Sequence, residues 1–146
     1  MSDPRPWDSL LSLDRVTELY AEGIQRYGGD PSGPKPGCVD GSIGAAWMAE
    51  SYSDPAPGRL PGLVFAGYLL FYLSRNHCFT DGNKRVAWSA AMDVLLHYGL
   101  TIDTNADEAE ELMLSVIARR IDDGLEVVSW LSERLIAAEA VLPGHG

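Results

Sequence analysis

The hydrophobic positions in the first part of the chain have the spacing of a helix with one buried face. Between residues 13 and 27, apolar side chains recur at intervals of three and four residues, the period of an amphipathic helix. These side chains are Leu13, Val16, Leu19, Tyr20, Ile24 and Tyr27. Gly28 and Gly29 end the predicted helix. The turn-forming residues of GGDPSGPKPG (28–37) then predict an irregular loop.

The middle of the chain predicts three more helices. The first is expected over residues 42–51, before a segment rich in proline and glycine interrupts it. Its inward-facing side chains are Ile43, Ala46 and Trp47. Residues 63–76 are apolar on every side, which is typical of a helix surrounded by other helices. An apolar stripe with helical spacing follows over residues 86–98, and Gly99 ends it.

The last third of the chain predicts two further helices, over residues 105–122 and 126–140, which Asp123 and Gly124 separate. The longest strand-like pattern is LTID, around residues 100–103. We therefore expect an all-α fold, a single-domain helical bundle. Its expected parts are an N-terminal extension (1–12), the helical domain (13–140) and a flexible tail (141–146).

Length and charge narrow the class of protein. With 146 residues, the chain has the size of one domain that can bury a core without added cross-links. Its formal net charge of -10 disfavours nucleic acid and anionic membranes, because both attract basic surfaces. The longest uncharged apolar run, residues 63–73, would span about 16 Å as a helix, roughly half of a bilayer core. The N-terminus also lacks the layout of a signal peptide. We expect no nucleic-acid partner and no membrane segment.

The two cysteines, Cys38 and Cys78, are too few and too irregularly placed to indicate a disulfide framework or a zinc site. The expected location is therefore the reducing cytoplasm. The sequence leaves open whether the two cysteines pair. Cys78 is interpreted as a small buried side chain, with a catalytic thiol as the alternative.

The segment HCFTDGNKR (77–85) lies between the two central predicted helices and concentrates the polar chemistry of the chain. One interpretation is a helix-to-helix turn, in which Thr80 or Asp81 caps the next helix and the following glycine relieves the turn. In that case Phe79 would fill the core, and Lys84 and Arg85 would be solvated.

The other interpretation is a phosphate site at the start of a helix. Gly82 and Asn83 stand where backbone N–H groups and the positive end of the helix dipole bind anions. Lys84 and Arg85 are poorly placed at that end unless an anion is bound there. A single carboxylate, Asp81, suits Mg²⁺ when substrate phosphates and water complete its coordination.

His77 lies just before these groups, and its imidazole could accept a proton from an attacking hydroxyl. Phosphate contacts, a metal ligand and a base within one turn are typical of phosphoryl or nucleotidyl transfer.

HCFTDGNKR resembles the signature of the Fic/Doc family: His, any residue, Phe, any residue, Asp or Glu, Gly or Ala, Asn, Gly or Lys, and Arg. The family is all-α, with this motif between two central helices. The resemblance covers most of residues 13–135 and implies a role for each motif residue. By that resemblance His77 is the base, Asp81 the magnesium ligand, Gly82, Asn83 and Arg85 bind the nucleotide phosphates, and Phe79 anchors the loop.

Lys84 distinguishes two branches of the family. Adenylylating members usually have glycine there and a second arginine three residues after the first, where this chain has Trp88. The sequence is therefore similar to the Doc branch, the toxins of bacterial toxin–antitoxin modules. That resemblance implies transfer of the γ-phosphate of Mg-ATP to a Ser or Thr hydroxyl of a translation protein such as elongation factor Tu, with Lys84 and Arg85 among the catalytic residues. The alternatives are transfer of AMP to a protein hydroxyl and a catalytically silent protein-binding module.

Two departures and two surrounding segments bear on this resemblance. Gly82 replaces the alanine of the best-known Doc pattern, and Cys78 replaces a proline or aliphatic residue. Residues 51–62 are expected to be either a flap that docks the target peptide or a plain surface loop.

The family's inhibitory pattern is Ser or Thr, three residues, Glu, then Gly or Asn. The segments 104–109 and 129–134 begin it but end in Ala and Arg. We therefore expect restraint by a separate antitoxin protein.

Overall fold

The apolar segment in the middle of the chain forms the central helix of the fold, as its pattern predicts. The computed structural model describes residues 5–53 and 60–138. Within them the elements are α1 (Leu13–Tyr27), α2 (Cys38–Ser51), α3 (Leu63–Arg75), α4 (Asn83–His97), β1 (Leu100–Ile102), α5 (Ala106–Ile117), α6 (Gly124–Glu133) and β2 (Leu135–Ala137). The expected all-α class is confirmed, with one small two-stranded sheet added to the helices.

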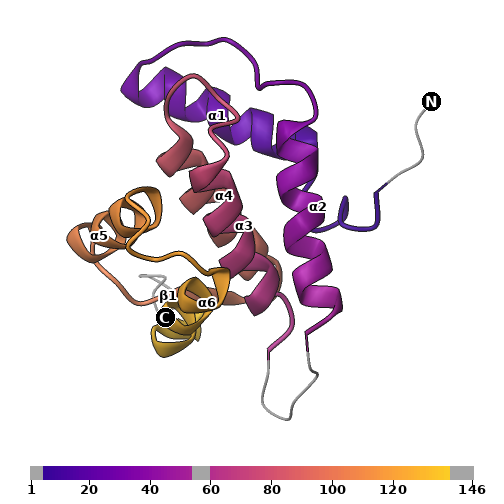
Figure 1. Cartoon of the computed structure of the whole chain (residues 1–146), viewed down its shortest axis with the longest axis vertical. Coiled ribbons are helices and arrows are strands. Elements are labelled where there is room, and N and C mark those ends of the chain that lie inside the picture. The colour runs from indigo at the N-terminus through magenta and orange to yellow at the C-terminus, as the bar shows by residue number, and fades with distance from the viewer. Residues whose placement is uncertain (1–4, 54–59, 139–146) are drawn as a thin grey trace, which may run out of the picture.

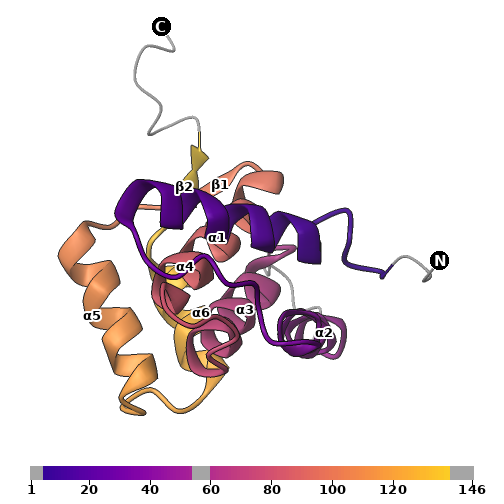
Figure 2. The same ribbon diagram turned by 90° about the horizontal axis from the view of Figure 1, so that it is seen from above.

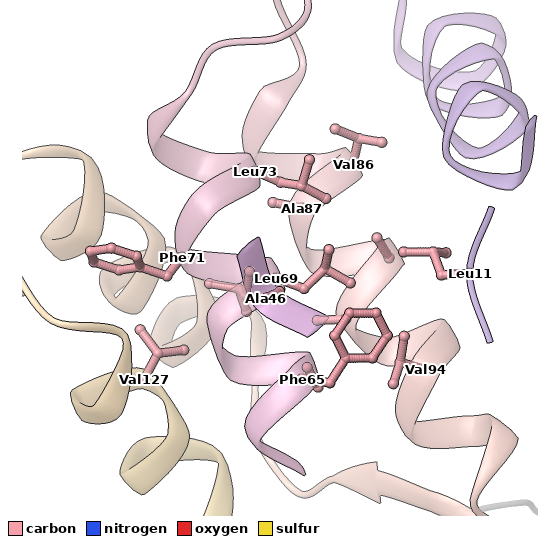
Figure 3. Packing of buried hydrophobic residues seen from close by; sticks show 14 of the residues in the cluster. Leu11, Ala46, Phe65, Leu69, Phe71, Leu73, Val86, Ala87, Val94 and Val127 are labelled. Atoms are coloured by element: carbon pink, nitrogen blue, oxygen red, sulfur yellow. The ribbon is translucent and has the colours of Figure 1, made fainter. Parts of the chain in front are cut away.

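Helix α3 is buried on nearly all sides because α2, α4 and α6 pack around it. Figure 1 shows α2 on one side of the α3–α4 pair and α5 and α6 on the other. In Figure 3, Phe65 and Leu69 of α3 point into the space shared with Ala46 of α2 and Val94 of α4. All four side chains are inaccessible to solvent, so the two central helices hold the loop between them on a rigid base.

Helix α1 has the bounds that its hydrophobic stripe predicts, and it crosses over α4 (Figure 2). Ser12 caps it by accepting a hydrogen bond from the Arg15 N–H. The Arg15 guanidinium donates two hydrogen bonds to Asp93 of α4, at 2.9 and 3.2 Å. The residues before α1 also pack on the helices: Leu11 is 1% exposed, and the Trp7 ring lies over Gly44 of α2.

Helix α2 begins four residues earlier than its predicted start at residue 42. Gly37 adopts a left-handed conformation (φ 77°) at the N-cap, so the chain can turn directly into the helix at Cys38. Asp40 then lies in the first turn, where a negative charge is favourable. Ile43 and Ala46 are buried as expected, and Trp47 is half-buried against the core.

The predictions for the C-terminal third were partly wrong. Helix α5 ends at Ile117 rather than at residue 122, and α6 begins at Gly124, because the Asp123 carboxylate accepts from the Leu125 N–H and caps it. Residues 135–137 form strand β2 instead of continuing the helix, since they pair antiparallel with β1. The predicted tail, residues 141–146, lies outside the described residues. No helix among the described ranges is long and apolar enough to cross a membrane.

A disulfide joins Cys38, at the start of α2, to Cys78, in the loop between α3 and α4. The sequence left this pairing open, because the two residues are separated by 40 positions. Cys78 is 1% exposed, as expected for a buried side chain, but its sulfur is not a free thiol. The bond therefore ties α2 to the residue that follows His77, and in this form it excludes the alternative of a catalytic thiol.

The disulfide gives a prediction for stability. Closing a loop with a sequence separation of 40 residues restricts the unfolded chain and is expected to add about 4 kcal/mol to the free energy of unfolding. Urea unfolding of the wild type with and without dithiothreitol measures this difference. The double variant Cys38→Ser/Cys78→Ser is the control, and its midpoint should not respond to the reductant. If dithiothreitol left the urea midpoint of the wild type unchanged, the disulfide would not stabilise the protein.

The crossing of α3 and α6 gives a second prediction. A methyl group at Gly67 would lie 2.5 Å from Val128 Cγ2 and 3.0 Å from its Cα. Gly67→Ala is therefore expected to lower the free energy of unfolding by about 1–3 kcal/mol. Gly41→Ala, on the exposed face of α2 with nothing within 4 Å, should instead raise it by about 0.5–1 kcal/mol. If chemical denaturation gave the same change in the free energy of unfolding for both variants, the close contact of α3 with α6 at Gly67 would not limit the size of that residue.

Candidate functional site

The start of helix α4 opens into a cleft between α1, α4 and α5. The cleft has a volume of about 1290 Å³, and its walls include the motif residues His77, Gly82, Asn83, Lys84 and Arg85. Ligand pockets in proteins usually measure about 300–1,000 Å³. This cleft is therefore large enough for a nucleotide with space left for part of a second ligand.

The loop before α4 is held in shape by Phe79 and Asn83. The Asn83 side-chain amide donates to the Phe79 carbonyl at 2.9 Å, and its oxygen accepts from the Phe79 N–H at 3.0 Å. Phe79 is 2% exposed. The side chain of Asn83, which the resemblance assigns to phosphate, thus bonds to the loop at both its oxygen and its nitrogen.

Tyr20 of α1 is a site residue that the sequence reasoning missed. Its ring stacks on Phe79, with 4.0 Å between centroids and 16° between planes, and its hydroxyl donates to the Asp30 carbonyl. Burial raises the pKa of Tyr20, and the nearby carboxylates of Asp81 and Asp30 raise it further, so the hydroxyl stays protonated and can donate. The hydrophobic stripe placed Tyr20 inward but carried no signal for this bond.

The N-terminus of α4 has no side-chain cap. Gly82 stands at the N-cap in a left-handed conformation (φ 74°), and no side chain among the described residues accepts from the first N–H groups of the helix. The alternative in which Thr80 or Asp81 caps the helix is therefore wrong. Free N–H groups at the positive end of a helix dipole form an anion site.

Two cations stand in the first turn of α4 and line the cleft. The Lys84 Nζ lies 2.7 Å from Glu110 Oε1 of α5, and both side chains are partly exposed. The Arg85 guanidinium lies 4.6 Å from the centre of the Tyr27 ring, and no carboxylate within the described ranges forms an ion pair with it. Lys84 therefore has a weak, exposed partner, whereas Arg85 is available to an incoming anion.

His77 lies at the beginning of the loop between α3 and α4, lines the cleft and is exposed to solvent. Its φ of 49° lies in the left-handed region, which is uncommon for a residue other than glycine and is concentrated at functional sites. The neighbouring Cys78 holds the backbone there through its disulfide and through its carbonyl, which accepts from the Lys35 N–H at 2.8 Å. The structure thus places His77 in the same cleft as both cations.

Asp81 is separate from the cleft walls and faces the loop after α1. Its Oδ2 accepts from the Asp30 N–H at 3.2 Å. No group of three or more acidic, histidine or cysteine side chains able to hold a metal occurs in the described part of the chain. Asp81 immediately precedes the N-cap of α4 in the chain, and a single carboxylate is the kind of protein ligand that Mg²⁺ uses together with substrate phosphates.

Position 88, one turn into α4, is occupied by a tryptophan that packs against a second aromatic residue. The rings of Trp88 and Trp130 of α6 meet edge to face, with 6.2 Å between their centroids and 78° between their planes. Trp88 also lines the cleft. This wall of the cleft is therefore aromatic. In the family that the motif resembles, adenylylating members carry an arginine at the position of Trp88.

Comparisons with known proteins agree with this geometry. Residues 10–96 match the model of the Fic/DOC family, a range that contains α1 to α3, the whole motif and all but the last residue of α4. The chain is 39% identical over 112 residues to a protein named Toxin Doc from Mycolicibacterium smegmatis, covering 75% of this chain and 83% of that protein. It is 29% identical over 102 residues to Protein kinase doc of Escherichia phage P1, covering 68% of this chain and 76% of that protein.

The match extends over more than half of the chain, and the structure has the all-α fold with the motif between its two central helices. The protein therefore belongs to the Fic/DOC family.

Proposed function

We propose that this protein is a toxin of a toxin–antitoxin module, a transferase that moves the γ-phosphate of Mg-ATP to a Ser or Thr hydroxyl of a translation protein. The uncapped start of α4, with Lys84 and Arg85 in its first turn and His77 in the same cleft, is the observation that carries this proposal. The names of the two relatives, a Doc toxin and a Doc protein kinase, support it.

Each step of the proposed reaction is assigned to a residue of the motif. The triphosphate binds the N–H groups at the start of α4 and the guanidinium of Arg85. The positive charge of Arg85 then balances part of the negative charge of the phosphates. The target hydroxyl oxygen attacks the γ-phosphorus and gives its proton to His77. The bond from the γ-phosphorus to the β,γ-bridging oxygen breaks, and ADP leaves.

The metal ligand of this proposal is Asp81, which immediately precedes Gly82 at the N-cap of α4. Mg²⁺ bound by Asp81 and the phosphates supplies positive charge that offsets the charge of the triphosphate. Gly82 permits the close approach of a phosphate to the backbone, and Asn83 keeps the helix start in place through its two bonds to Phe79.

Lys84 and Trp88 favour transfer of phosphate rather than of AMP. An exposed ion pair such as Lys84–Glu110 contributes roughly 0–1 kcal/mol, so Lys84 can leave Glu110 for a phosphate at little cost. The aromatic contact of Trp88 with Trp130 leaves no cation at the position where adenylylating enzymes of the family carry a second arginine.

We propose that a separate antitoxin protein restrains this activity, and that the target is similar to elongation factor Tu. The Cys38–Cys78 disulfide removes the reason that the cysteines gave for expecting a reducing cytoplasm. The two segments that begin the inhibitory pattern have their acidic residues engaged elsewhere. Glu108 lies 3.4 Å from Arg134 and Glu133 lies 3.6 Å from it. These groups line a second, smaller pocket rather than the motif cleft. Residues 54–59, half of the segment expected to be either a flap or a plain surface loop (51–62), lie outside the described residues.

The proposed reaction is tested by following each phosphate of ATP. The protein is incubated with a bacterial lysate, or with purified elongation factor Tu, and with ATP labelled at the α or the γ position. We expect γ-label on a protein, and a loss of roughly 10²–10⁴-fold in His77→Ala, because a positioned base contributes about that much. Label from the α position would instead show transfer of AMP. Absence of any transfer that depends on His77 would favour the binding module.

Lys84 provides a second test. We expect Lys84→Gly to reduce γ-transfer at least about tenfold, in the range of a lost charged hydrogen bond. Glu110→Gln is the matched control, since it removes the same ion pair but keeps the cation, and it should retain wild-type transfer. Initial rates of γ-label incorporation measure both variants. Unchanged activity in Lys84→Gly would mean that this lysine does not contact the phosphates.

A further inference from the structure

The carboxylate of Asp81 lies against the backbone of the loop that follows α1, and both of its oxygens meet that loop. Oδ2 accepts from the Asp30 N–H at 3.2 Å. Oδ1 lies only 2.6 Å from the point where a Cβ atom at residue 29 would stand. Gly29 is therefore the residue type that leaves room for this carboxylate, and its φ of 131° also favours glycine.

The loop that receives Asp81 is itself fixed at two points. The Tyr20 hydroxyl donates to the Asp30 carbonyl, while the Tyr20 ring stacks on Phe79. The Asp30 carboxylate accepts from the N–H and the hydroxyl of Ser32, at 2.8 and 2.6 Å. The side chain of Asp30 is thus engaged within its own turn, which leaves its N–H directed at Asp81.

We propose that Gly29, Asp30 and Tyr20 position Asp81 for Mg²⁺, an inference that rests on the proposed function. Asp81 is exposed, so without these contacts its side chain is free to rotate. Groups that contact a metal ligand fix its orientation, and their loss typically costs about 10–100-fold in metal affinity. No group of three or more possible metal-ligating side chains occurs among the described residues, so the contacts with this loop are the ones that orient Asp81.

Two neighbouring glycines separate this positioning role from general strain in the loop. Gly29→Ala places a methyl group 2.6 Å from Asp81 Oδ1 and 2.8 Å from Ile24 Cδ1. The carboxylate is the end of a rotatable side chain, so it is the group that gives way. Gly28→Ala introduces the same methyl group at a positive φ of 81°, in the same loop, with nothing within 4 Å. It strains the backbone without touching Asp81.

The experiment measures ATP binding by the full-length protein with and without Mg²⁺, using isothermal titration calorimetry. We expect Mg²⁺ to tighten ATP binding in the wild type, and Asp81→Asn to lose that gain. Gly29→Ala should lose about tenfold or more of the Mg²⁺-dependent gain while binding metal-free ATP within twofold of the wild type. Gly28→Ala should keep the gain.

Tyr20→Phe tests the same arrangement without a glycine substitution, because it keeps the ring that stacks on Phe79 and removes only the hydroxyl. We expect the Mg²⁺-dependent increase in ATP affinity to be several-fold smaller in Tyr20→Phe than in the wild type. If Gly29→Ala does not fold, Tyr20→Phe alone tests the inference. A full gain in Gly29→Ala or in Tyr20→Phe, an equal loss in Gly28→Ala, or no gain in the wild type would each overturn the inference. The readout is binding, so a failure of the proposed transfer reaction would be recognised separately in the labelled-phosphate assay.

Discussion

The pair of hydrogen bonds between the Asn83 side chain and the Phe79 backbone determines where the other groups of the motif lie. It closes the loop between α3 and α4 around a buried aromatic ring, on which Tyr20 stacks from α1. Because the loop is closed in this way, Gly82 can start α4 without a side-chain cap and the first N–H groups of the helix remain open to an anion. The chemistry of the site depends on a buried amide that need not touch the substrate.

The electrostatics of the site follow from that closed loop. The protein as a whole carries a formal net charge of -10, yet Lys84 and Arg85 stand together at the positive end of a helix. The helix dipole opposes this placement, and a bound triphosphate would offset it. A site of this kind is stabilised by its substrate, which is why neither cation is bound into a strong, buried ion pair in the described part of the chain.

Local patterns predicted α1, α3 and the position of the motif, because each depends on the spacing of neighbouring residues or on glycines next to them. The errors arose where distant residues decide the structure. Strand β2 forms because it pairs with β1, some 35 residues earlier, and the early part of α2 is joined to Cys78 across 40 residues. The role of Tyr20 could be seen only in the structure. A hydrophobic stripe indicates which face of a helix is buried, but not which atom the Tyr20 hydroxyl contacts.

The most direct test of this account is a crystal structure of the protein with Mg²⁺ and a non-hydrolysable ATP analogue. The account predicts that the triphosphate binds at the N–H groups of residues 83–85, with the γ-phosphorus closer to the His77 imidazole than the α-phosphorus. It also predicts that Asp81 contacts the metal while keeping its bond to the Asp30 N–H. An α-phosphorus placed next to His77, or a triphosphate bound away from the start of α4, would contradict it.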